Sequence, residues 1–171
     1  TRVMSGAGST AADSPPLRQY SKCRCTAPGD PLSPIDGMPT TIKGLSNVLG
    51  WPNQRGSKLI DPTPATEEGS PVRNLRAAGA VFIGLTTTPE FGHMPWTEAP
   101  LFGRTRNAWD PTRTSGGSSG GAAVACAAGL GPLAVATDAG GSTRIPAACN
   151  GVVGIKQSIG LIPHDIAPDA F

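Results

Sequence analysis

Two serine residues stand in two glycine-rich segments of the chain. Ser118 lies within the run Thr114–Gly121, and Ser142 follows 24 residues later within the segment Asp138–Pro146. Because glycine has no side chain and tolerates positive φ angles, such segments let backbone amides approach a ligand closely. A serine hydroxyl beside such amide donors is typical of acyl transfer, so either hydroxyl is a candidate nucleophile.

A serine nucleophile needs a base within hydrogen-bond reach, and histidine is the usual one. His93 lies between glycine and methionine neighbours and His164 lies near the end of the chain, so we expect both to be structural or surface residues. A lysine can take the place of histidine if burial keeps its amine neutral near pH 7.

Other classes of protein use similar glycine-rich runs. Gly116–Gly120 fits the G-x-S-x-G nucleophile elbow, which would make Ser118 the nucleophile of an α/β-hydrolase. That elbow directly follows a strand, whereas residues 107–114 contain Asp110 and Pro111 and are typical of a loop. A phosphate-binding loop is disfavoured because no Lys-Ser or Lys-Thr pair follows the glycines. A glycine-rich helix start that only packs closely would explain one segment but not both.

Helices and strands are expected to alternate in the first half of the chain. Met38–Lys43 has the pattern of a short strand. Ser70–Gly79 predicts a helix with Ser70 as its N-cap, proline at the first helical position and glycine at its end. Ala80–Thr86 then predicts a buried strand. This step from helix to strand is typical of α/β architecture.

The second half of the chain places both serines beside such elements. Ser119–Leu130 is small and apolar enough for a buried helix, and Leu133–Thr137 predicts the next strand. Ala139–Ser142 is then a tight loop at the carboxyl end of that strand, and Val152–Lys156 predicts a further strand. Loops at the carboxyl ends of strands are the usual site position in open α/β sheets.

The composition indicates one globular domain with a moderate core. The 171 residues are 38% hydrophobic, and the net charge of +2 comes without a cluster of lysine and arginine. This charge pattern disfavours a nucleic-acid binder and an anionic-membrane binder. The longest apolar stretch, Ala122–Ala136, is broken by glycine and proline and is too short to span a bilayer, and no signal peptide is visible.

The four cysteines form neither a disulfide framework nor a zinc-binding pattern. We expect Cys126 and Cys149 to be buried free thiols, and Cys23 and Cys25 are too close together for a usual zinc pair; this fits a reducing compartment. Residues 1–34 are rich in serine, proline, alanine and glycine without periodicity, which predicts a poorly ordered N-terminal arm.

Five segments together resemble the amidase signature family in order and spacing, over roughly residues 37–163. They are Gly37–Lys43, Leu75–Gly84, Thr88–Phe91, Thr114–Gly121 and Asp138–Pro146. The resemblance implies an α/β fold with a mixed β-sheet core flanked by helices. Residues 35–171 would then be the N-terminal part of an amidase signature domain, in truncated form.

In that family catalysis uses a Ser-cisSer-Lys triad, and the matching positions are Ser142 as nucleophile, Ser118 as bridging serine and Lys43 as base. The resemblance implies a cis peptide bond between Gly117 and Ser118. It also requires a buried Lys43, because a neutral amine near pH 7 needs its pKa lowered by about three units through desolvation.

The loop around the nucleophile has further implied roles. The backbone of Ala139, Gly140, Gly141 and Ser142 matches the oxyanion hole of the family, which binds the substrate carbonyl oxygen. Asp138 and Arg144 are expected to hold the loop in shape as a pair. Ser119 is expected to support the site through hydrogen bonds, and Ser115 to be a turn or cap residue.

The implied function is that of a cytoplasmic amidase that hydrolyses a small-molecule carboxylic amide to an acid and an amine or ammonia. No cofactor, metal, membrane or nucleic acid is expected, and a homo-oligomer is compatible with this function. One alternative is the A subunit of the aminoacyl-tRNA amidotransferase, in which the same triad releases ammonia from glutamine. The segment Asp138–Pro146 favours a stand-alone amidase over that subunit. A second alternative is a non-catalytic remnant.

The chain also departs from the family pattern. Gly44 stands where relatives commonly carry an aspartate after the catalytic lysine, which leaves the support of Lys43 open. The family domain is much longer than this chain, and the chain does not begin with methionine. We therefore expect an N-terminal fragment that is inactive by itself.

Overall fold

The computed structural model describes residues 30–163. The chain divides into two units, residues 1–31 and 32–171, and the helices and strands described lie in the second. The predicted N-terminal arm lies almost entirely outside the described residues, as do Cys23, Cys25 and His164.

A parallel three-stranded sheet organises this unit. It consists of β1 (Pro39–Lys43), β2 (Val81–Thr86) and β5 (Leu133–Val135), in the order β2-β1-β5. The central strand β1 carries four consecutive buried residues, and its last residue, Lys43, pairs with Thr86 of β2. On the other side Ile42 pairs with Val135. All three strands were predicted, to within two residues at each end.

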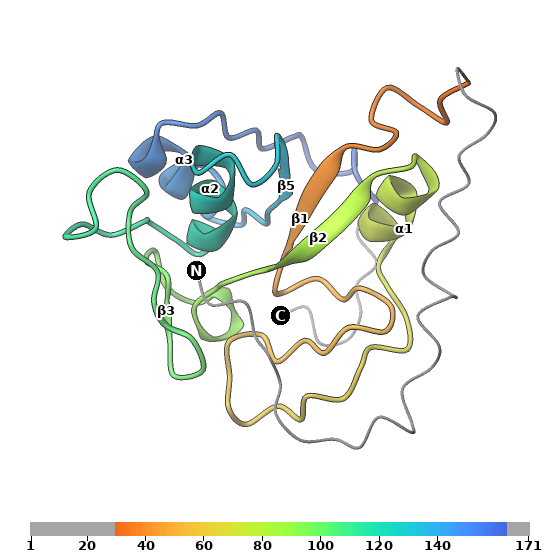
Figure 1. The fold of residues 1–171 in the computed structure, drawn as a ribbon. Coiled ribbons are helices and arrows are strands. Elements are labelled where there is room, and N and C mark those ends of the chain that lie inside the picture. Colours follow the sequence, from red (N-terminus) through yellow and green to blue (C-terminus); the bar gives the residue numbers. More distant parts are fainter. Residues whose placement is uncertain (1–29, 164–171) are drawn as a thin grey trace. The chain divides into compact units, whose positions relative to one another are not determined.

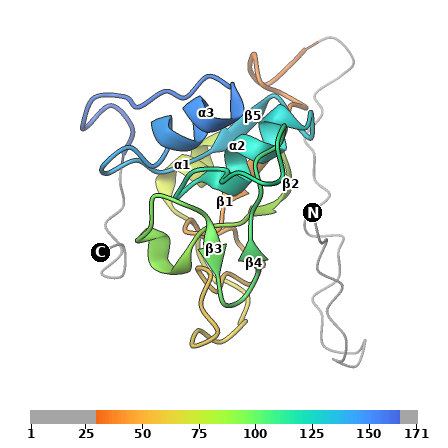
Figure 2. The same ribbon diagram turned by 90° about the vertical axis from the view of Figure 1, so that its left-hand side faces the viewer.

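Three helices pack around this sheet, and Figures 1 and 2 show α1 on one side of it with α2 and α3 on the other. Their bounds are α1 Ser70–Ala77, α2 Gly120–Ala127 and α3 Arg144–Asn150. The core on the α1 side joins Ile42, Val48 and Val72. On the other side α2 presents the buried alanines 122, 123 and 125, whose small side chains allow the helix to approach the sheet closely.

Short elements complete the fold between β2 and α2. A 3₁₀ turn, η2 (Glu90–Gly92), is followed by the antiparallel pair β3 (Glu98–Ala99) and β4 (Gly103–Arg104). Among residues 30–163 there is no helix long and apolar enough to cross a bilayer.

The start of α1 differs from its prediction. The N-cap is Gly69, whose carbonyl accepts hydrogen bonds from the amides of Val72 and Arg73, and no side chain caps the helix. The hydroxyl of Ser70 instead accepts a hydrogen bond from the Arg73 guanidinium. The predicted glycine end is confirmed, because Gly79 has a φ angle of +90° just after the helix.

The prediction of a fully buried β2 was wrong. Val81 and Ile83 are 40% and 46% exposed. β2 is an edge strand, and residues two apart in a strand point to the same face. That face of β2 is therefore only partly covered by the described part of the chain.

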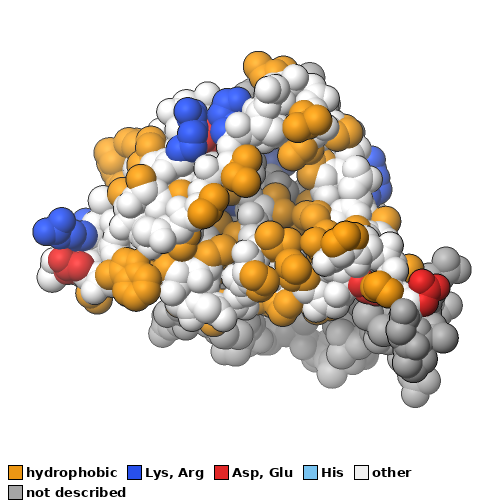
Figure 3. All heavy atoms as spheres, turned by 90° about the horizontal axis from the view of Figure 1, so that it is seen from above, with side chains coloured by type: hydrophobic (Ala, Val, Ile, Leu, Met, Phe, Trp, Pro, Cys, Tyr) orange, Lys and Arg blue, Asp and Glu red, His pale blue; other side chains and the backbone are white. Residues whose placement is uncertain are grey.

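The predicted strand Val152–Lys156 is also absent. A strand is defined by hydrogen bonds to a neighbouring strand, and this segment has no such neighbour within residues 30–163. Val153 and Ile155 are 88% and 78% exposed. Figure 3 shows exposed hydrophobic side chains around a hollow on the face seen from above.

Candidate active site

Lys43 and Ser118 meet in the interior of the unit. Lys43 is the last residue of the central strand and is 0% exposed, which confirms the predicted burial. Its Nζ atom donates hydrogen bonds to Ser118 Oγ and to Thr137 Oγ1, each over 2.7 Å. Ser118 is 1% exposed. The amine is thus held by two hydroxyl groups and is shielded from water.

This environment changes the acid–base behaviour of the lysine. Burial lowers the pKa of Lys43 from its ordinary value of 10.5 to about 7, while attraction to Asp138 acts in the opposite direction. Desolvation disfavours the charged ammonium, and the Asp138 carboxylate compensates for only part of this effect. Near neutral pH a substantial fraction of the molecules carries a neutral amine, which is the form that can accept a proton.

The peptide bond between Gly117 and Ser118 is cis, as the resemblance implies. The glycines around it serve close packing of the protein on itself. A Cβ atom at Gly117 would lie 2.6 Å from the Trp96 carbonyl carbon, and one at Gly116 would lie 2.9 Å from Pro146 Cα. The expectation that this first glycine run opens its backbone to a ligand was therefore wrong, because protein atoms fill that space.

Ser115 and Ser119 have supporting positions on either side. Ser115 is buried, and its hydroxyl donates to the Thr105 carbonyl over 3.1 Å. The hydroxyl of Ser119 donates to the Thr137 carbonyl over 3.3 Å, and its amide donates to the Ser142 carbonyl over 3.1 Å. Ser119 thereby ties the segment that carries Ser118 to the segment that carries Ser142.

The loop after β5 is organised around the carboxylate of Asp138. This carboxylate accepts hydrogen bonds from the amides of Gly141, Thr143 and Arg144, over 2.7, 3.2 and 3.3 Å. It also accepts two from the Arg144 guanidinium, both over 2.9 Å. The Arg144 hydrogen bond is the main reason why the pKa of Asp138 lies well below its usual range. The predicted pair is present and fixes the backbone around Ser142.

The amides expected to form the oxyanion hole are not equivalent. Gly141 donates to Asp138 and is occupied. The amides of Ala139, Gly140 and Ser142 have no acceptor among the residues described. Ala139 and Gly140 are exposed, and a Cβ atom at Gly140 would meet nothing within 4 Å. These three amides are therefore the donors of the loop that are left available to a ligand.

Two threonines in the site were not identified from the sequence. Thr137 accepts a hydrogen bond from Lys43, and Thr97 donates to the Gly116 carbonyl over 2.9 Å while it accepts from the Gly120 amide over 3.0 Å. A signal for Thr137 existed. Thr137 is the last residue of the predicted strand Leu133–Thr137, and parallel pairing of that strand with β1 would bring its side chain beside the end of β1.

The glycine at position 44 leaves Lys43 supported by other groups. The Gly44 amide donates to the Thr86 carbonyl over 3.0 Å, and a Cβ atom would lie 3.0 Å from that same oxygen. A larger residue would thus require Thr86 to shift. In this chain the two hydroxyls at Ser118 and Thr137, rather than a side chain at 44, orient the amine.

The remaining candidate groups lie outside this arrangement. His93 is exposed, and Cys126 and Cys149 are free thiols. The expected burial of Cys149 was wrong, because it faces solvent from α3, whereas Cys126 is half-buried. The described part of the chain contains no group of three or more histidine, cysteine, aspartate or glutamate side chains that could hold a metal ion.

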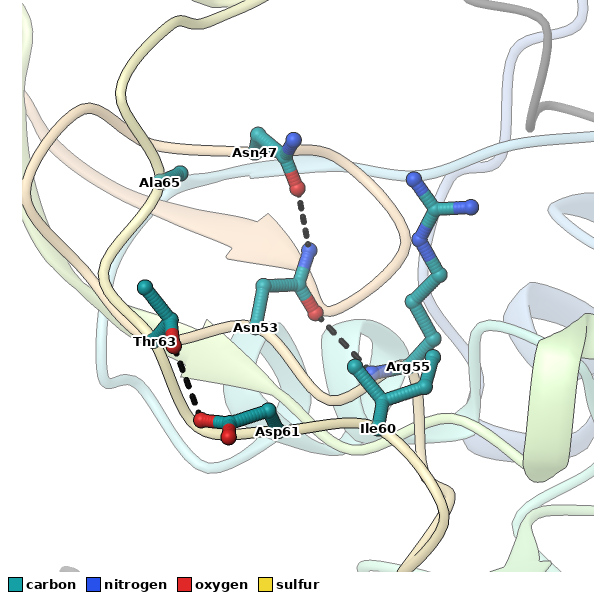
Figure 4. A pocket seen from close by; sticks show the side chains of 7 residues that line it. All are labelled: Asn47, Asn53, Arg55, Ile60, Asp61, Thr63 and Ala65. Carbon is teal, nitrogen blue, oxygen red and sulfur yellow. Dashed lines mark hydrogen bonds between the residues drawn. The ribbon is translucent and has the colours of Figure 1, made fainter.

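A pocket of about 340 Å³ lies in the long loop between β1 and α1 (Figure 4). Five of its seven lining residues are polar, and Asn53 donates to Asn47 over 3.1 Å. The lining consists of Asn47, Asn53, Arg55, Ile60, Asp61, Thr63 and Ala65. None of the triad candidates lines this pocket, so it is separate from the buried lysine and the two serines.

Comparisons with known proteins agree with the fold. The Amidase family model matches residues 8–168. The chain is 47% identical to an acylamidase of Rhodococcus erythropolis over 143 residues, and 49% identical to an indoleacetamide hydrolase of Bradyrhizobium diazoefficiens over 137 residues. These alignments cover 84% and 80% of this chain. They cover only 30% and 26% of the relatives.

Solved structures give the same result. The peptide amidase of Stenotrophomonas maltophilia superposes with a TM-score of 0.74 at 33% identity, over 87% of this chain and 30% of that protein. The chain belongs to the amidase signature family. It spans less than a third of the length of the relatives that it matches.

Proposed function

We propose that this chain carries the catalytic triad of an amide hydrolase. Neutral Lys43 accepts the hydroxyl proton of Ser118 while Ser118 accepts that of Ser142. The Ser142 Oγ atom attacks the amide carbonyl carbon, and the carbonyl π pair moves to oxygen. Collapse of this intermediate breaks the C–N bond and leaves an acyl ester on Ser142. The leaving nitrogen takes a proton returned through Ser118 from the Lys43 ammonium, and water then hydrolyses the ester by the same proton path.

The contact between Lys43 and Ser118 carries this proposal. A buried amine with a pKa near 7, 2.7 Å from a buried hydroxyl, has the protonation state and the distance that general-base catalysis needs. The hydrogen bond from the Ser119 amide to the Ser142 carbonyl supports the placement of the nucleophile beside the bridging serine.

The open amides of Ala139, Gly140 and Ser142 supply the second part of the proposed chemistry. Negative charge develops on the substrate oxygen as Ser142 attacks. Preorganised amides stabilise that charge, and one such donor typically contributes about 100- to 1000-fold in rate. The Asp138–Arg144 pair keeps these amides in place without contacting the substrate.

The proposed substrates are small carboxylic amides, consistent with relatives that are named acylamidase and indoleacetamide hydrolase. We further propose that turnover depends on residues outside the 171-residue chain, because the donors at Ala139 and Gly140 stand exposed and the alignment covers only 30% of the acylamidase. The isolated chain would then acylate slowly and would not turn over.

A chimaera tests the proposed triad separately from the proposed need for residues outside the 171-residue chain. In it, the 143 aligned residues of this chain replace their counterparts in the Rhodococcus erythropolis acylamidase. The chimaera should hydrolyse amides, and its Ser142→Ala variant should lose at least about 1000-fold in rate. Fluorophosphonate should label Ser142 in the chimaera, as detected by peptide mass spectrometry. Near-normal turnover by Ser142→Ala would refute the assignment of the nucleophile.

The amidotransferase alternative differs in its substrate and its partners. It predicts ammonia release from glutamine only when partner subunits and tRNA are present. The proposed amidase should hydrolyse simple amides without either. Measurement of both reactions under matched conditions distinguishes the two functions.

A further inference from the structure

The side chain of Asn150 is buried and makes three hydrogen bonds. It is the last residue of α3 and is 0% exposed. Its Nδ2 atom donates to the Ser115 and Pro146 carbonyls, both over 2.8 Å, and its Oδ1 atom accepts from the Ala108 amide over 3.0 Å. A buried amide with both protons donated holds its neighbours in one arrangement, since any shift leaves a buried group unpaired.

Two of the three partners of Asn150, Ser115 and Pro146, lie on the two segments that carry the serines. Ser115 precedes Ser118 by three residues, and α3 begins two residues after Ser142. The Asn150 side chain therefore joins the helix that follows one serine to the loop that leads to the other. At the opposite end the same segments are joined by the Ser119 amide and the Ser142 carbonyl.

The loop rests directly on the helix between these two links. A Cβ atom at Gly116 would lie 2.9 Å from Pro146 Cα and 3.2 Å from Cys149 Sγ. Glycine at 116 thus lets the two backbones touch. Van der Waals contact between two backbones fixes the distance between the segments but still lets one slide along the other. The directional hydrogen bonds of Asn150 can prevent this sliding and so fix the register.

We propose that Asn150 is a positioning residue that sets the register of the Ser115–Ser119 loop on α3 and thereby the placement of Ser118 relative to Ser142. It acts through the Ser115 carbonyl and does not contact the substrate. The catalytic consequence rests on the proposed function above, whereas the positioning itself is a property of the folded chain.

The first test uses the unmodified 171-residue chain and amide hydrogen exchange measured by NMR. If Asn150 holds the loop, its side-chain NH₂ protons and the Ser119 amide proton should exchange through the same opening. Their protection factors should agree to within about fivefold. Exchange of the Asn150 NH₂ protons at least 100 times faster than expected from the Ser119 amide would overturn the proposal.

The second test compares Asn150→Ala, Asn150→Ser and Glu68→Ala. The Asn150→Ser variant keeps a small hydrogen-bonding hydroxyl, so it should fold even if Asn150→Ala does not. Glu68 is the matched control, because it is also buried and hydrogen-bonded but joins Leu49 to Arg76, with no link to either serine segment. The Asn150 variants should speed exchange at Ser119 at least tenfold more than at Val72 in α1. Glu68→Ala should show no such excess.

The pKa of Lys43 provides a second measurement on the same variants. A displaced loop admits water to the amine, so the pKa of Lys43, measured by ¹⁵N NMR of Nζ, should move from about 7 toward 10.5 in Asn150→Ser and stay unchanged in Glu68→Ala. In the chimaera, Asn150→Ser should lower kcat at least tenfold with KM within twofold. Uniform exchange increases and an unchanged Lys43 pKa would show a merely structural role and overturn the proposal.

These outcomes are distinguishable from failure of the proposed function. If fluorophosphonate does not label Ser142 and the chimaera is inactive, the triad assignment fails. The exchange rates and the Lys43 titration would still decide whether Asn150 positions the loop.

Discussion

The Nζ atom of Lys43 lies 2.7 Å from the Oγ atom of Ser118, although 75 residues separate them in the chain. The contact forms because β1 is the central strand of the sheet and ends in the interior, where the loop before α2 passes over it. A lysine in this place loses its hydration and hydrogen-bonds to two neutral hydroxyls, and the attraction of Asp138 offsets only part of that loss. Its lowered pKa is thus a consequence of the topology rather than of a nearby cation.

The pH dependence of Ser142 acylation should report this amine. Only the neutral form of Lys43 accepts a proton, so kcat/KM of the chimaera should rise about tenfold per pH unit below 7 and level off above it. Lys43→Arg should abolish the reaction, because a guanidinium stays charged throughout this range. A profile that is flat between pH 5.5 and 8 would contradict Lys43 as the base.

The same shift predicts how stability changes with pH. The pKa of Lys43 is about 7 in the folded chain against an ordinary value of 10.5, so between these values the unfolded chain binds more protons. The free energy of unfolding contributed by Lys43 therefore rises with pH from about 7 to about 10.5 and is lowest below 7. Lowering the pKa of Lys43 from 10.5 to about 7 corresponds to a change of about 5 kcal/mol in the free energy of unfolding across this pH range.

Urea unfolding of the wild-type chain and of Lys43→Met between pH 6 and 10 measures this contribution. Methionine cannot be protonated, so the variant should be the more stable protein at pH 6, and its advantage should shrink as the pH rises. Because other titrating groups are common to both proteins, their contributions cancel in the difference between the two free energies of unfolding. An advantage that is constant with pH would mean that the pKa of Lys43 is not lowered by folding.

The parts of the fold that were predicted correctly depend on local signals. Apolar residues between turn formers mark β2 and β5, and a proline near the start with a glycine after the end marks α1. The triad candidates were found by family resemblance, because two glycine-flanked serines and a lysine have no spacing that physics alone would pair. Their contact at Lys43 and Ser118 arises only from the tertiary fold.

The features that were missed depend on neighbours distant in the sequence. The exposure of Ile83 depends on what covers an edge strand, and the missing strand at Val152–Lys156 depends on whether a partner strand is present. The roles of Thr137 and Asn150 depend on which carbonyl or amine the fold brings within 3 Å. None of these neighbours is specified by the residues beside them.

Thr137 should prove important for the orientation of the catalytic amine. Thr137→Val keeps the shape of the side chain but removes the hydroxyl that accepts a hydrogen bond from Lys43. The loss of one hydrogen bond of about 1 to 1.5 kcal/mol should lower the acylation rate of the chimaera about tenfold. The midpoint of its pH profile should also fall, because the ammonium loses an acceptor.

Thr137→Ser is the matched control for that experiment. It retains the hydroxyl and should stay within about threefold of the wild-type rate, since one methyl group contributes little to orientation. Equal rates for the valine and serine variants would show that the hydroxyl does not support Lys43.

The two glycine-rich segments should respond differently to alanine. In a helix, Gly→Ala ordinarily stabilises by about 1 kcal/mol. At Gly121 of α2, however, the new Cβ atom would lie 2.5 Å from the Thr87 amide nitrogen, a backbone atom that cannot move freely. Gly121→Ala should therefore destabilise the chain by at least about 2 kcal/mol, measured by urea unfolding.

Gly140→Ala should instead affect the chemistry. No atom lies within 4 Å of the new Cβ, so stability should change by less than about 0.5 kcal/mol. The added methyl group occupies the open space beside the free amides of Ala139 and Ser142, where the substrate carbonyl is proposed to bind. Fluorophosphonate labelling of Ser142 should slow about tenfold or more. If labelling is unaffected while Gly121→Ala unfolds the chain, the carbonyl must bind on another side of the Ser142 loop.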